Sequence, residues 1–399
     1  MRIAVGVEPA YDNVTGTSVY VTELVSHLAR VDYRNEYTLF TSGTYRDAPD
    51  MDVGGNERFR RRSLPLSHRT CLGLWLMLNW PPVNHSIGDH DLYHCMTPTT
   101  FPATHGRYLV TVHDLGYMLR PQLCPRRHRH MRQVHLWRLL RQADQFVAVS
   151  EWTKRDMVEH LGVPSERITV IPEGGRPAFR PLPRRQVERV LERYGVEERY
   201  FLVVGDMNPR KNHVRMVRAF ARVVKRTSEP VRLLFAGPRG YRADRTVHEV
   251  RSLALTDHVR FLGYIPEMDL VALMNGAVAL VFVSLYEGFG LPILEAMATD
   301  TPVITSAISS MPEVAGDAAL LVDPLSEEAI AEAARILNEA DSPLIYGLSS
   351  MATEAQRKAV ELADRLGAMI DTTSSVCHGP TGLAMQAVGE PTCTLGEVR

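Results

Sequence analysis

The most chemically informative stretch of the sequence is residues 286–298, which read YEGFGLPILEAMA. We expect an apolar strand to end just before it, a glycine-bearing loop to follow, and Pro292 to stand in the first turn of a helix. Backbone amides and the positive end of the helix dipole would then face the carboxyl edge of a sheet, where open α/β sheets bind anionic ligands. The pattern predicts a phosphate site, in which Glu287 can reach sugar hydroxyls and Glu295 a ribose.

A second stretch with similar chemistry is residues 204–212, VGDMNPRKN, between a predicted strand and an amphipathic helix. Gly205 permits close backbone approach, and Arg210 and Lys211 can bring two cationic donors to a diphosphate. Lysine is rare in this chain, which has only four, so Lys211 stands out at this position. The alternative for each stretch is a plain loop whose charged side chains are solvated.

Short apolar runs alternate with amphipathic stretches along the chain, as in residues 2–7 followed by 20–28, and 145–149 followed by 153–161. Repeated units of this kind predict a parallel sheet covered by helices on both faces. The alternation restarts after a polar, proline-bearing stretch, which we interpret as a linker over residues 174–198. The fold class is therefore α/β, with two doubly wound Rossmann-like domains over residues 1–175 and 176–335 and a βα fragment over 336–399. One continuous large sheet is the alternative.

The amino-acid composition excludes several classes of function for this protein. The formal net charge of −1 argues against nucleic acid as the main partner. The five cysteines are scattered and form no CxxC pair, which favours a reducing cytoplasm over a disulfide framework or a zinc site. The sequence opens directly into a strand pattern and has no apolar run of membrane-spanning length, so neither export nor a membrane span is expected.

Taken together, these motifs resemble a known enzyme family. EGFGLPILEA at 287–296, Arg-Lys-Asn at 210–212, TPVIT at 301–305 and PEVAG at 312–316 are similar in type and order to the hallmarks of the family-4 glycosyltransferases. These are retaining enzymes of the GT-B fold, in which two Rossmann-like domains face a cleft. The resemblance spans residues 1 to about 335.

The resemblance implies a role for each residue of the donor site. Arg210 and Lys211 would bind the donor diphosphate, and Glu295 the nucleotide ribose. Glu287 would act on the transferred sugar, together with a donor-binding loop formed by Gly288, Phe289, Gly290 and Leu291.

The first domain would supply the acceptor side. Gly16 would let the first loop approach the phosphates, although the family usually has two adjacent glycines where this chain has Thr15-Gly16. His113, in the sequence Val-His-Asp, would contact the sugar or a hydroxyl at the reacting centre and act in catalysis beside Glu287. A structural imidazole at a strand end is the alternative for His113.

The activity implied is transfer of a hexose, mannose or glucose, from GDP-mannose or a UDP-sugar to a glycan or lipid-linked acceptor, with retention. Catalysis would rest on positioning and electrostatics. Arg210, Lys211 and the helix near Pro292 would neutralise the leaving diphosphate, so no metal ion and no other cofactor is expected. A nucleotide-sugar-binding protein without turnover remains an alternative.

Two basic stretches flank an apolar, aromatic-rich one in the first domain. The basic stretches are residues 58–62 and 126–141, and the apolar one is residues 71–80. Arginines beside such a helix could hold the domain on an anionic membrane, at the inner face in a cytoplasmic protein. A core helix with solvated arginines is the alternative.

The last sixty or so residues depart from the glycosyltransferase pattern and predict a strand over 342–350, a helix over 354–367 and a loop containing Cys377-His-Gly-Pro. This segment resembles part of one subunit of formylmethanofuran dehydrogenase, a molybdopterin or tungstopterin enzyme. In that family this cysteine ligates the metal, which would map to Cys377. A metal site needs its further ligands, so a junction of two unrelated coding segments is the preferred interpretation, and a non-functional fusion remains an alternative.

Overall fold

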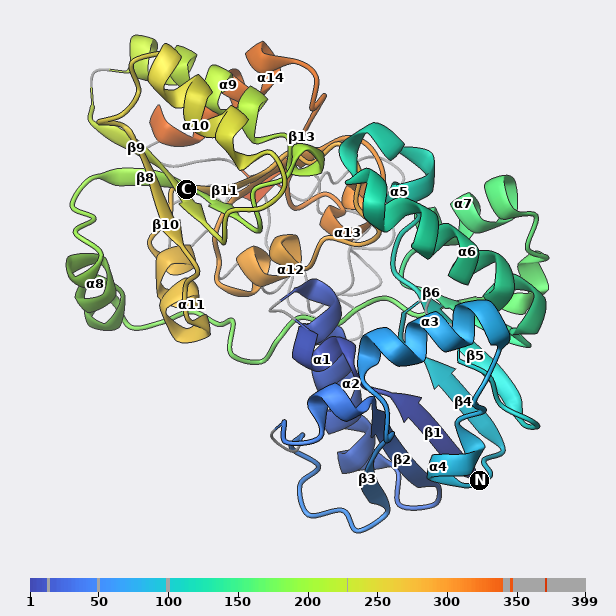
Figure 1. Ribbon diagram of the computed structural model, residues 1–399. Coiled ribbons are helices and arrows are strands. Elements are labelled where there is room, and N and C mark those ends of the chain that lie inside the picture. Colours follow the sequence, from blue (N-terminus) through green and yellow to red (C-terminus); the bar gives the residue numbers. More distant parts are fainter. Residues whose placement is uncertain are drawn as a thin grey trace, which may run out of the picture. The chain divides into compact units, whose positions relative to one another are not determined.

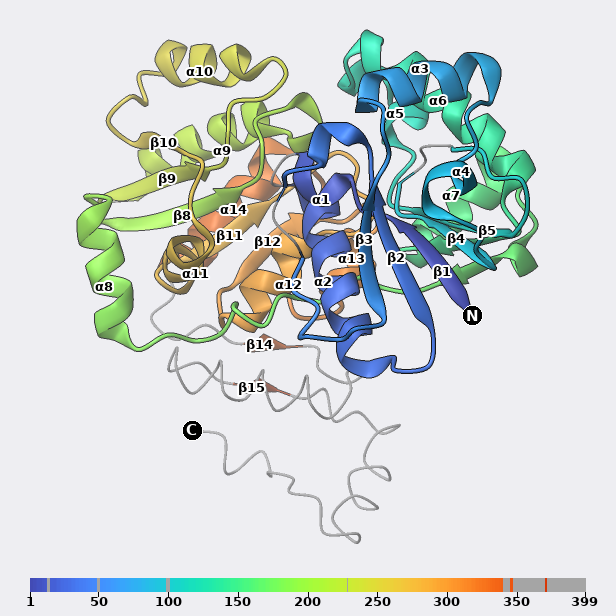
Figure 2. The same cartoon turned by 60° about the horizontal axis from the view of Figure 1, so that its bottom comes forward.

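The computed structural model describes residues 1–12, 15–48, 51–97, 101–227, 229–339, 345–346 and 370–371. Its contacts divide the chain into two compact units. The first unit contains Met1–Gly174 together with Glu287–Leu291, and the second contains Gly175–Tyr286 together with Pro292–Arg399. Each is an α/β unit around its own parallel sheet, as the sequence predicts (Figures 1 and 2).

The sheet of the first unit has the strand order β3-β2-β1-β4-β5-β6-β7, with every neighbouring pair parallel. Its strands are β1 (Arg2–Gly6), β2 (Glu36–Thr41), β3 (Phe59–Ser63), β4 (Leu92–Cys95), β5 (Arg107–Val112), β6 (Gln145–Ala148) and β7 (Ile168–Val170). The order reverses between β1 and β4, so the loops after these two strands lie at the topological switch point.

Helices cover both faces of this sheet. They are α1 (Pro9–Asp12), α2 (Gly16–Val31), α3 (His68–Leu78), α4 (Asn84–Ile87), α5 (Gly116–Leu119), α6 (Arg126–Gln142) and α7 (Glu151–Leu161), with 3-10 turns at Gly43–Tyr45, Pro121–Leu123 and Ser165–Arg167. Val21, Val25 and Ala29 of α2 pack on one face of the sheet. Trp75 of α3 and Leu136 of α6 belong to the cluster on the other face.

The second unit repeats the plan with the strand order β10-β9-β8-β11-β12-β13, again parallel, and its switch point lies between β8 and β11. Its strands are β8 (Arg199–Val204), β9 (Val231–Ala236), β10 (Val259–Gly263), β11 (Ala279–Phe282), β12 (Val303–Ser306) and β13 (Leu320–Val322). Its helices are α8 (Arg184–Arg193), α9 (His213–Arg226), α10 (Ala243–Ser252), α11 (Glu267–Asn275), α12 (Leu291–Ala298), α13 (Met311–Ala315) and α14 (Glu327–Glu339), with a 3-10 turn at Pro209–Lys211.

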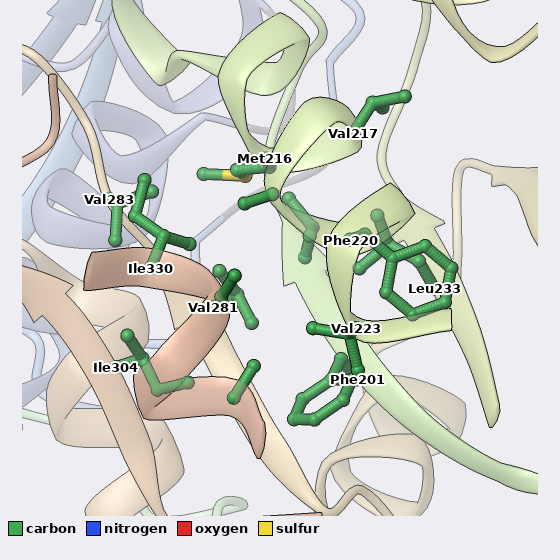
Figure 3. Packing of buried hydrophobic residues seen from close by; sticks show 14 of the residues in the cluster. Phe201, Met216, Val217, Phe220, Val223, Leu233, Val281, Val283, Ile304 and Ile330 are labelled. Atoms are coloured by element: carbon green, nitrogen blue, oxygen red, sulfur yellow. The ribbon is translucent and has the colours of Figure 1, made fainter. Parts of the chain in front are cut away.

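Alternate residues of each central strand of the second unit point into two separate apolar cores. Phe201 and Val203 of β8 pack with α9 and α14 on one face, around Phe220 and Ile330 (Figure 3). Leu202 of β8 joins the other core with residues of α8, α11, α12 and α13. Burial on both faces explains why these strands are continuous apolar runs in the sequence.

Two polar stretches form a helix and a strand that the sequence does not predict. The expected linker over 174–198 contains helix α8, whose Val187 and Val190 are buried against the second unit. The basic stretch 58–62 forms most of edge strand β3, in which Phe59 is buried and Arg61 donates to the carbonyls of Tyr45 and Ala48. Arg61 therefore fastens a loop, whereas Arg60 and Arg62 are exposed.

In the C-terminal segment the structure describes two short parallel strands, β14 (Ile345–Tyr346) and β15 (Ile370–Asp371). The predicted helix over 354–367 and Cys377 lie outside the described residues.

Glycines allow the strand ends of the second sheet to approach one another closely. Gly205 follows β8 with φ of 123°, and Gly237 follows β9 with φ of 156°. A Cβ atom added to Gly237 would lie 2.0 Å from the carbonyl oxygen of Gly205. The loop after β8 therefore depends on the absence of a side chain at Gly237.

We predict that Gly237→Ala destabilises the protein by roughly 3 kcal/mol or more, because a backbone clash adds to the strain of a positive φ. Gly263→Ala is the matched control, since Gly263 also has a positive φ (74°) but an added Cβ would meet no atom within 4 Å. The control should cost about 1–2 kcal/mol. Urea-unfolding midpoints of the two variants measure the difference, and equal losses would contradict the clash.

Candidate functional site

The loops after β8 and β11 meet at the switch point of the second sheet, where the sequence predicts the diphosphate site. The amide of Leu285 donates to the carbonyl of Arg210 (2.8 Å), and Nη1 of Arg210 donates to the carbonyl of Tyr286 (2.9 Å). The two predicted motifs are therefore neighbours in space.

The segment carrying Arg210 and Lys211 is held by two asparagines. The side chain of Asn208 accepts from the amide of Arg210 (3.0 Å) and caps the 3-10 turn. Asn212 adopts a left-handed conformation (φ 63°), which asparagine tolerates better than most residues. Its Nδ2 donates to the carbonyls of Val283 (3.0 Å) and Pro324 (2.7 Å). The backbone around the two cations is thus fixed from both sides.

Lys211 is a nearly buried cation, 9% exposed. Its Nζ lies 4.4 Å from the centre of the Phe282 ring, a cation–π arrangement. Its side chain passes Gly205, where an added Cβ would lie 3.3 Å from Cε. The glycine after β8 therefore makes room for this lysine.

Glu295 of α12 lies buried beside an arginine in the same unit. It is 3% exposed, and its Oε1 accepts from Nε of Arg176 (2.9 Å) and lies 2.8 Å from Nη2. Arg176 also donates to Glu267 at the start of α11, and its guanidinium lies 4.4 Å from the centre of the Phe179 ring. Burial raises the pKa of Glu295 above its usual value, while Arg176 and Lys211 act in the opposite direction.

In the first unit, His113 follows β5 and is held through both ring nitrogens. Nδ1 lies 2.9 Å from a carboxylate oxygen of Glu173, and Nε2 lies 3.1 Å from the carbonyl of Met96. The carboxylate of Glu173 and the carbonyl of Met96 therefore fix the orientation of the ring from two sides. The ring edge of Tyr20 packs against His113, with 4.8 Å between ring centres.

A second histidine, His94, lies near His113. Nε2 of His94 lies 2.9 Å from Oγ1 of Thr111, whose hydroxyl is in turn 3.5 Å from that of Tyr20. Burial lowers the pKa of His94 to about 4, and the nearby His113 acts in the same direction. His94 is therefore neutral near pH 7, and its role is a hydrogen bond with the hydroxyl of Thr111.

Residues 287–291 group with the first unit. The carbonyl of Gly288 accepts from Oγ of Ser150 (2.6 Å) and from Oγ1 of Thr153 (3.2 Å). A Cβ at Gly288 would lie 1.7 Å from the carbonyl oxygen of His113, so this position excludes any side chain. Glu287, Phe289 and Leu291 are 7%, 8% and 7% exposed, and Gly290 has φ of 128°.

Gly16 opens helix α2, and Thr15 caps it by accepting from the amide of Ser18 (3.3 Å). A Cβ at Gly16 would meet only Cδ1 of Leu291, at 3.7 Å, which is an ordinary contact. The protein alone therefore does not require glycine here.

The structure thus brings the predicted residues together in two groups. Arg210, Lys211 and Glu295 lie in the second unit, and Gly16 and His113 lie in the first with residues 287–291. Sequence reasoning missed Arg176 and Glu173, which hold Glu295 and His113. Both lie in PEGGRP at 172–177, a proline-bearing stretch at the start of the expected linker. The sequence signal for them is a pair of opposite charges that flank two glycines.

Among the described residues no group of three or more His, Cys, Asp or Glu side chains is placed to hold a metal ion. Within the same part of the chain, none of the helices combines the length and the apolar character that crossing a bilayer requires.

Comparisons with known proteins define the class. A family model described as "Glycosyltransferase Family 4" matches residues 14–177, and one described as "Glycosyl transferases group 1" matches residues 187–350. The chain is therefore a glycosyltransferase, and its two parallel-sheet units are those of the GT-B fold.

Its relatives include mannosyltransferases. It is 29% identical to O-antigen chain mannosyltransferase B of Escherichia coli, over 83% of this chain and 88% of the relative. It is 31% identical to O-antigen chain mannosyltransferase RfbU of Salmonella typhimurium, over 64% of this chain and 66% of the relative.

Solved structures agree in fold. Sucrose-phosphate synthase from Thermosynechococcus elongatus has a TM-score of 0.67 at 21% identity, covering 97% of this chain and 98% of that one. WaaG, a glycosyltransferase involved in lipopolysaccharide biosynthesis, has a TM-score of 0.66 at 16% identity, covering 98% and 100%. At these identities the likeness concerns the fold.

A shorter match is of a different kind. Over 73 residues the chain is 58% identical to a subunit of the tungsten-containing formylmethanofuran dehydrogenase 2 of Methanocaldococcus jannaschii. The match covers 18% of this chain and 17% of that relative, which supports the resemblance noted for the C-terminal segment and limits it to a fragment.

We predict a characteristic pH dependence for Glu295→Gln. The pKa of Glu295 in the folded protein is raised above 4.5, so the folded state binds more protons than the unfolded state above that pH. The wild-type protein therefore loses stability at this group as the pH rises from 4.5 to the folded pKa, and the variant does not. The melting temperature of Glu295→Gln minus that of the wild type should rise between about pH 4 and about pH 7.

Glu332→Gln is the control with the opposite sign, because Arg335 lowers the pKa of this half-exposed carboxyl. Its melting-temperature difference should fall over the same interval. A flat or falling difference for Glu295→Gln would contradict the effect of burial.

Proposed function

We propose that this protein transfers a hexose, with mannose first, from a nucleotide-sugar donor to a hydroxyl of a glycan or lipid-linked acceptor, with retention of configuration. The mannosyltransferase relatives support the sugar. The structure of Anabaena HepE was obtained in complex with UDP and glucose, which supports a nucleotide-sugar donor on this fold. Cys71 and Cys95 are free and buried, which fits the cytoplasmic location that we also propose.

The observation that carries the proposal is the group of Arg210, Lys211 and Glu295 in the second unit, of which Lys211 and Glu295 are nearly buried. Two cations at a switch point suit a diphosphate, and a fixed carboxylate suits the paired hydroxyls of a ribose. We assign Arg210 and Lys211 to the leaving diphosphate and Glu295 to the nucleotide ribose. Glu287 and the loop of Gly288, Phe289, Gly290 and Leu291 are assigned to the transferred sugar.

The chemistry that these residues perform is electrostatic. Negative charge develops on the diphosphate as the bond to the sugar breaks, and fixed cations stabilise it most where water is excluded. In the proposed retaining reaction the departing phosphate takes the proton of the acceptor hydroxyl on the same face of the sugar. Two protein cations already face the leaving group in this scheme, so we expect activity to persist in the presence of EDTA.

His113 is assigned to the sugar at the reacting centre, with Gly16 beside the phosphates. Glu173 contacts His113 and is assigned as a positioning residue.

The donor is tested with a thermal-shift panel of GDP-mannose, UDP-glucose, UDP-N-acetylglucosamine and the free nucleotides. A ligand that binds only the folded state at about one hundred times its Kd adds about 2.7 kcal/mol to the free energy of unfolding. We expect one donor class to raise the melting temperature of the wild type and of Lys225→Met. Lys211→Met should lose this shift, and its rate of nucleotide release with an acceptor glycan should fall by about a hundredfold.

Lys225 is the matched control because it is an exposed lysine near the end of α9, about four helical turns beyond Lys211. A shift that survives in Lys211→Met, or no shift from any donor, would contradict the assignment. Binding without release of nucleotide would favour a nucleotide-sugar-binding protein without turnover.

We predict that Glu173→Gln lowers kcat while leaving donor affinity near that of the wild type, since Glu173 orients His113 and is not assigned a donor contact. A loss of up to about a hundredfold is expected for a misplaced catalytic group. Glu166→Gln, at an exposed carboxylate of the same unit, serves as the control. Equal effects on kcat and on donor affinity would argue for a general structural role of Glu173.

A further inference from the structure

Five large apolar side chains are exposed on two helices of the first unit. Met77 and Leu78 at the end of α3, with Trp80 just beyond it, are 81%, 65% and 54% exposed. Val134 and Trp137 of α6 are 44% and 50% exposed. We call these five residues the α3–α6 surface.

The two helices lie side by side, as both views of the ribbon show (Figures 1 and 2). Arg138 of α6 donates to the carbonyl of Trp75 in α3, and Trp75 shares a buried cluster with Leu136 and Leu139 of α6. The exposed residues therefore belong to one region of the molecule.

Helical geometry separates these residues from the core of the unit. On α6, Leu136 and Leu139 are fully buried, whereas Val134 and Trp137 are one turn apart on the opposite side. Arg141, one turn further on, is exposed on that same side. An apolar and basic face therefore remains after the helix has contributed its buried face to the core.

The two segments of sequence that contain α3 and α6 differ in charge from the whole chain. Two stretches of sequence, residues 64–88 and 115–143, contain α3 and α6 and no Asp or Glu at all. They contain eight arginines, at positions 69, 120, 126, 127, 129, 132, 138 and 141. The chain as a whole has 46 acidic against 45 basic residues, so this local excess of positive charge is specific to the region.

We propose that the α3–α6 surface docks onto an anionic lipid bilayer. Two of the four tryptophans of the chain are exposed here, and tryptophan favours the boundary between lipid headgroups and acyl chains. Met77 and Leu78 supply apolar area that can enter that boundary, and the arginines supply attraction to lipid phosphates. A bilayer with anionic headgroups matches both the arginines and the exposed apolar side chains.

The proposal goes beyond the glycosyl transfer reaction, since none of the five residues is assigned to donor or acceptor sugar. The first unit, which we expect to receive the acceptor, would then lie on the surface of the bilayer. A lipid-linked acceptor would then be met at the bilayer surface.

The test is sedimentation of the full chain with vesicles of phosphatidylcholine alone and of phosphatidylcholine mixed with phosphatidylglycerol. We expect association with the mixed vesicles only, weakened by added salt because the attraction is partly electrostatic. The double variant Leu78→Ser/Trp137→Ser should lower the partition coefficient by about a hundredfold, at roughly tenfold for each apolar anchor removed. Donor-induced thermal shifts should be unchanged in this variant.

Val31→Ser/Tyr33→Ser is the matched control, because Val31 and Tyr33 are at least as exposed as Leu78 and Trp137, at 74% and 62%, and lie in the same unit outside the α3–α6 surface. Its partition should equal that of the wild type. Failure to sediment with mixed vesicles, equal binding to neutral vesicles, or equal loss in the control would overturn the proposal. Because donor binding is measured separately, these outcomes are distinguishable from failure of the proposed enzymatic function.

Discussion

A buried carboxylate can be kept at the edge of the second sheet only because an arginine is paired with it. Glu295 is almost fully withdrawn from water, and an ionised carboxylate in that position is costly unless it is paired. Arg176 meets this requirement and at the same time binds Glu267. One guanidinium thus joins the segment that enters the second unit to α11 and α12, so the polar site and the packing of these helices depend on the same ion pairs.

The same edge concentrates positive charge. Lys211 is held by backbone constraints at Gly205 and Asn212, and Arg210 is tied to the loop after β11. These cations have little freedom to move, which suits the role that we propose for them at a leaving diphosphate, because electrostatic stabilisation requires charges that are already in place. The rigidity comes from the strand ends and asparagine contacts of the fold, before any ligand is bound.

Much of this arrangement could be predicted from the sequence, for definite physical reasons. Buried parallel strands are apolar on both faces, so runs such as residues 200–204 were recognisable, and glycine loops followed by helices marked the carboxyl edge. Helix α8 was missed because it lies in a proline-bearing, arginine-rich stretch with only a few apolar positions. Edge strand β3 was missed because three successive arginines hide the alternation of buried Phe59 with exposed Arg60.

For the residues that orient His113 and Glu295, the sequence offers only opposite charges around two glycines, and that pattern does not say what either charge contacts. Glu173 contacts His113, which is 60 residues away in sequence, and Arg176 contacts Glu295, which is 119 residues away. No local periodicity records contacts at such separations.

Their proximity to each other in sequence now has a physical meaning. The boundary between the two units falls between Gly174 and Gly175, so Glu173 lies just before it and Arg176 just after it. Each unit therefore has its key polar side chain oriented by a residue at the point where the chain passes from one to the other. Since glycine leaves the backbone there free to adopt many conformations, the contacts of Glu173 with His113 and of Arg176 with Glu295 hold the residues on either side of the two glycines.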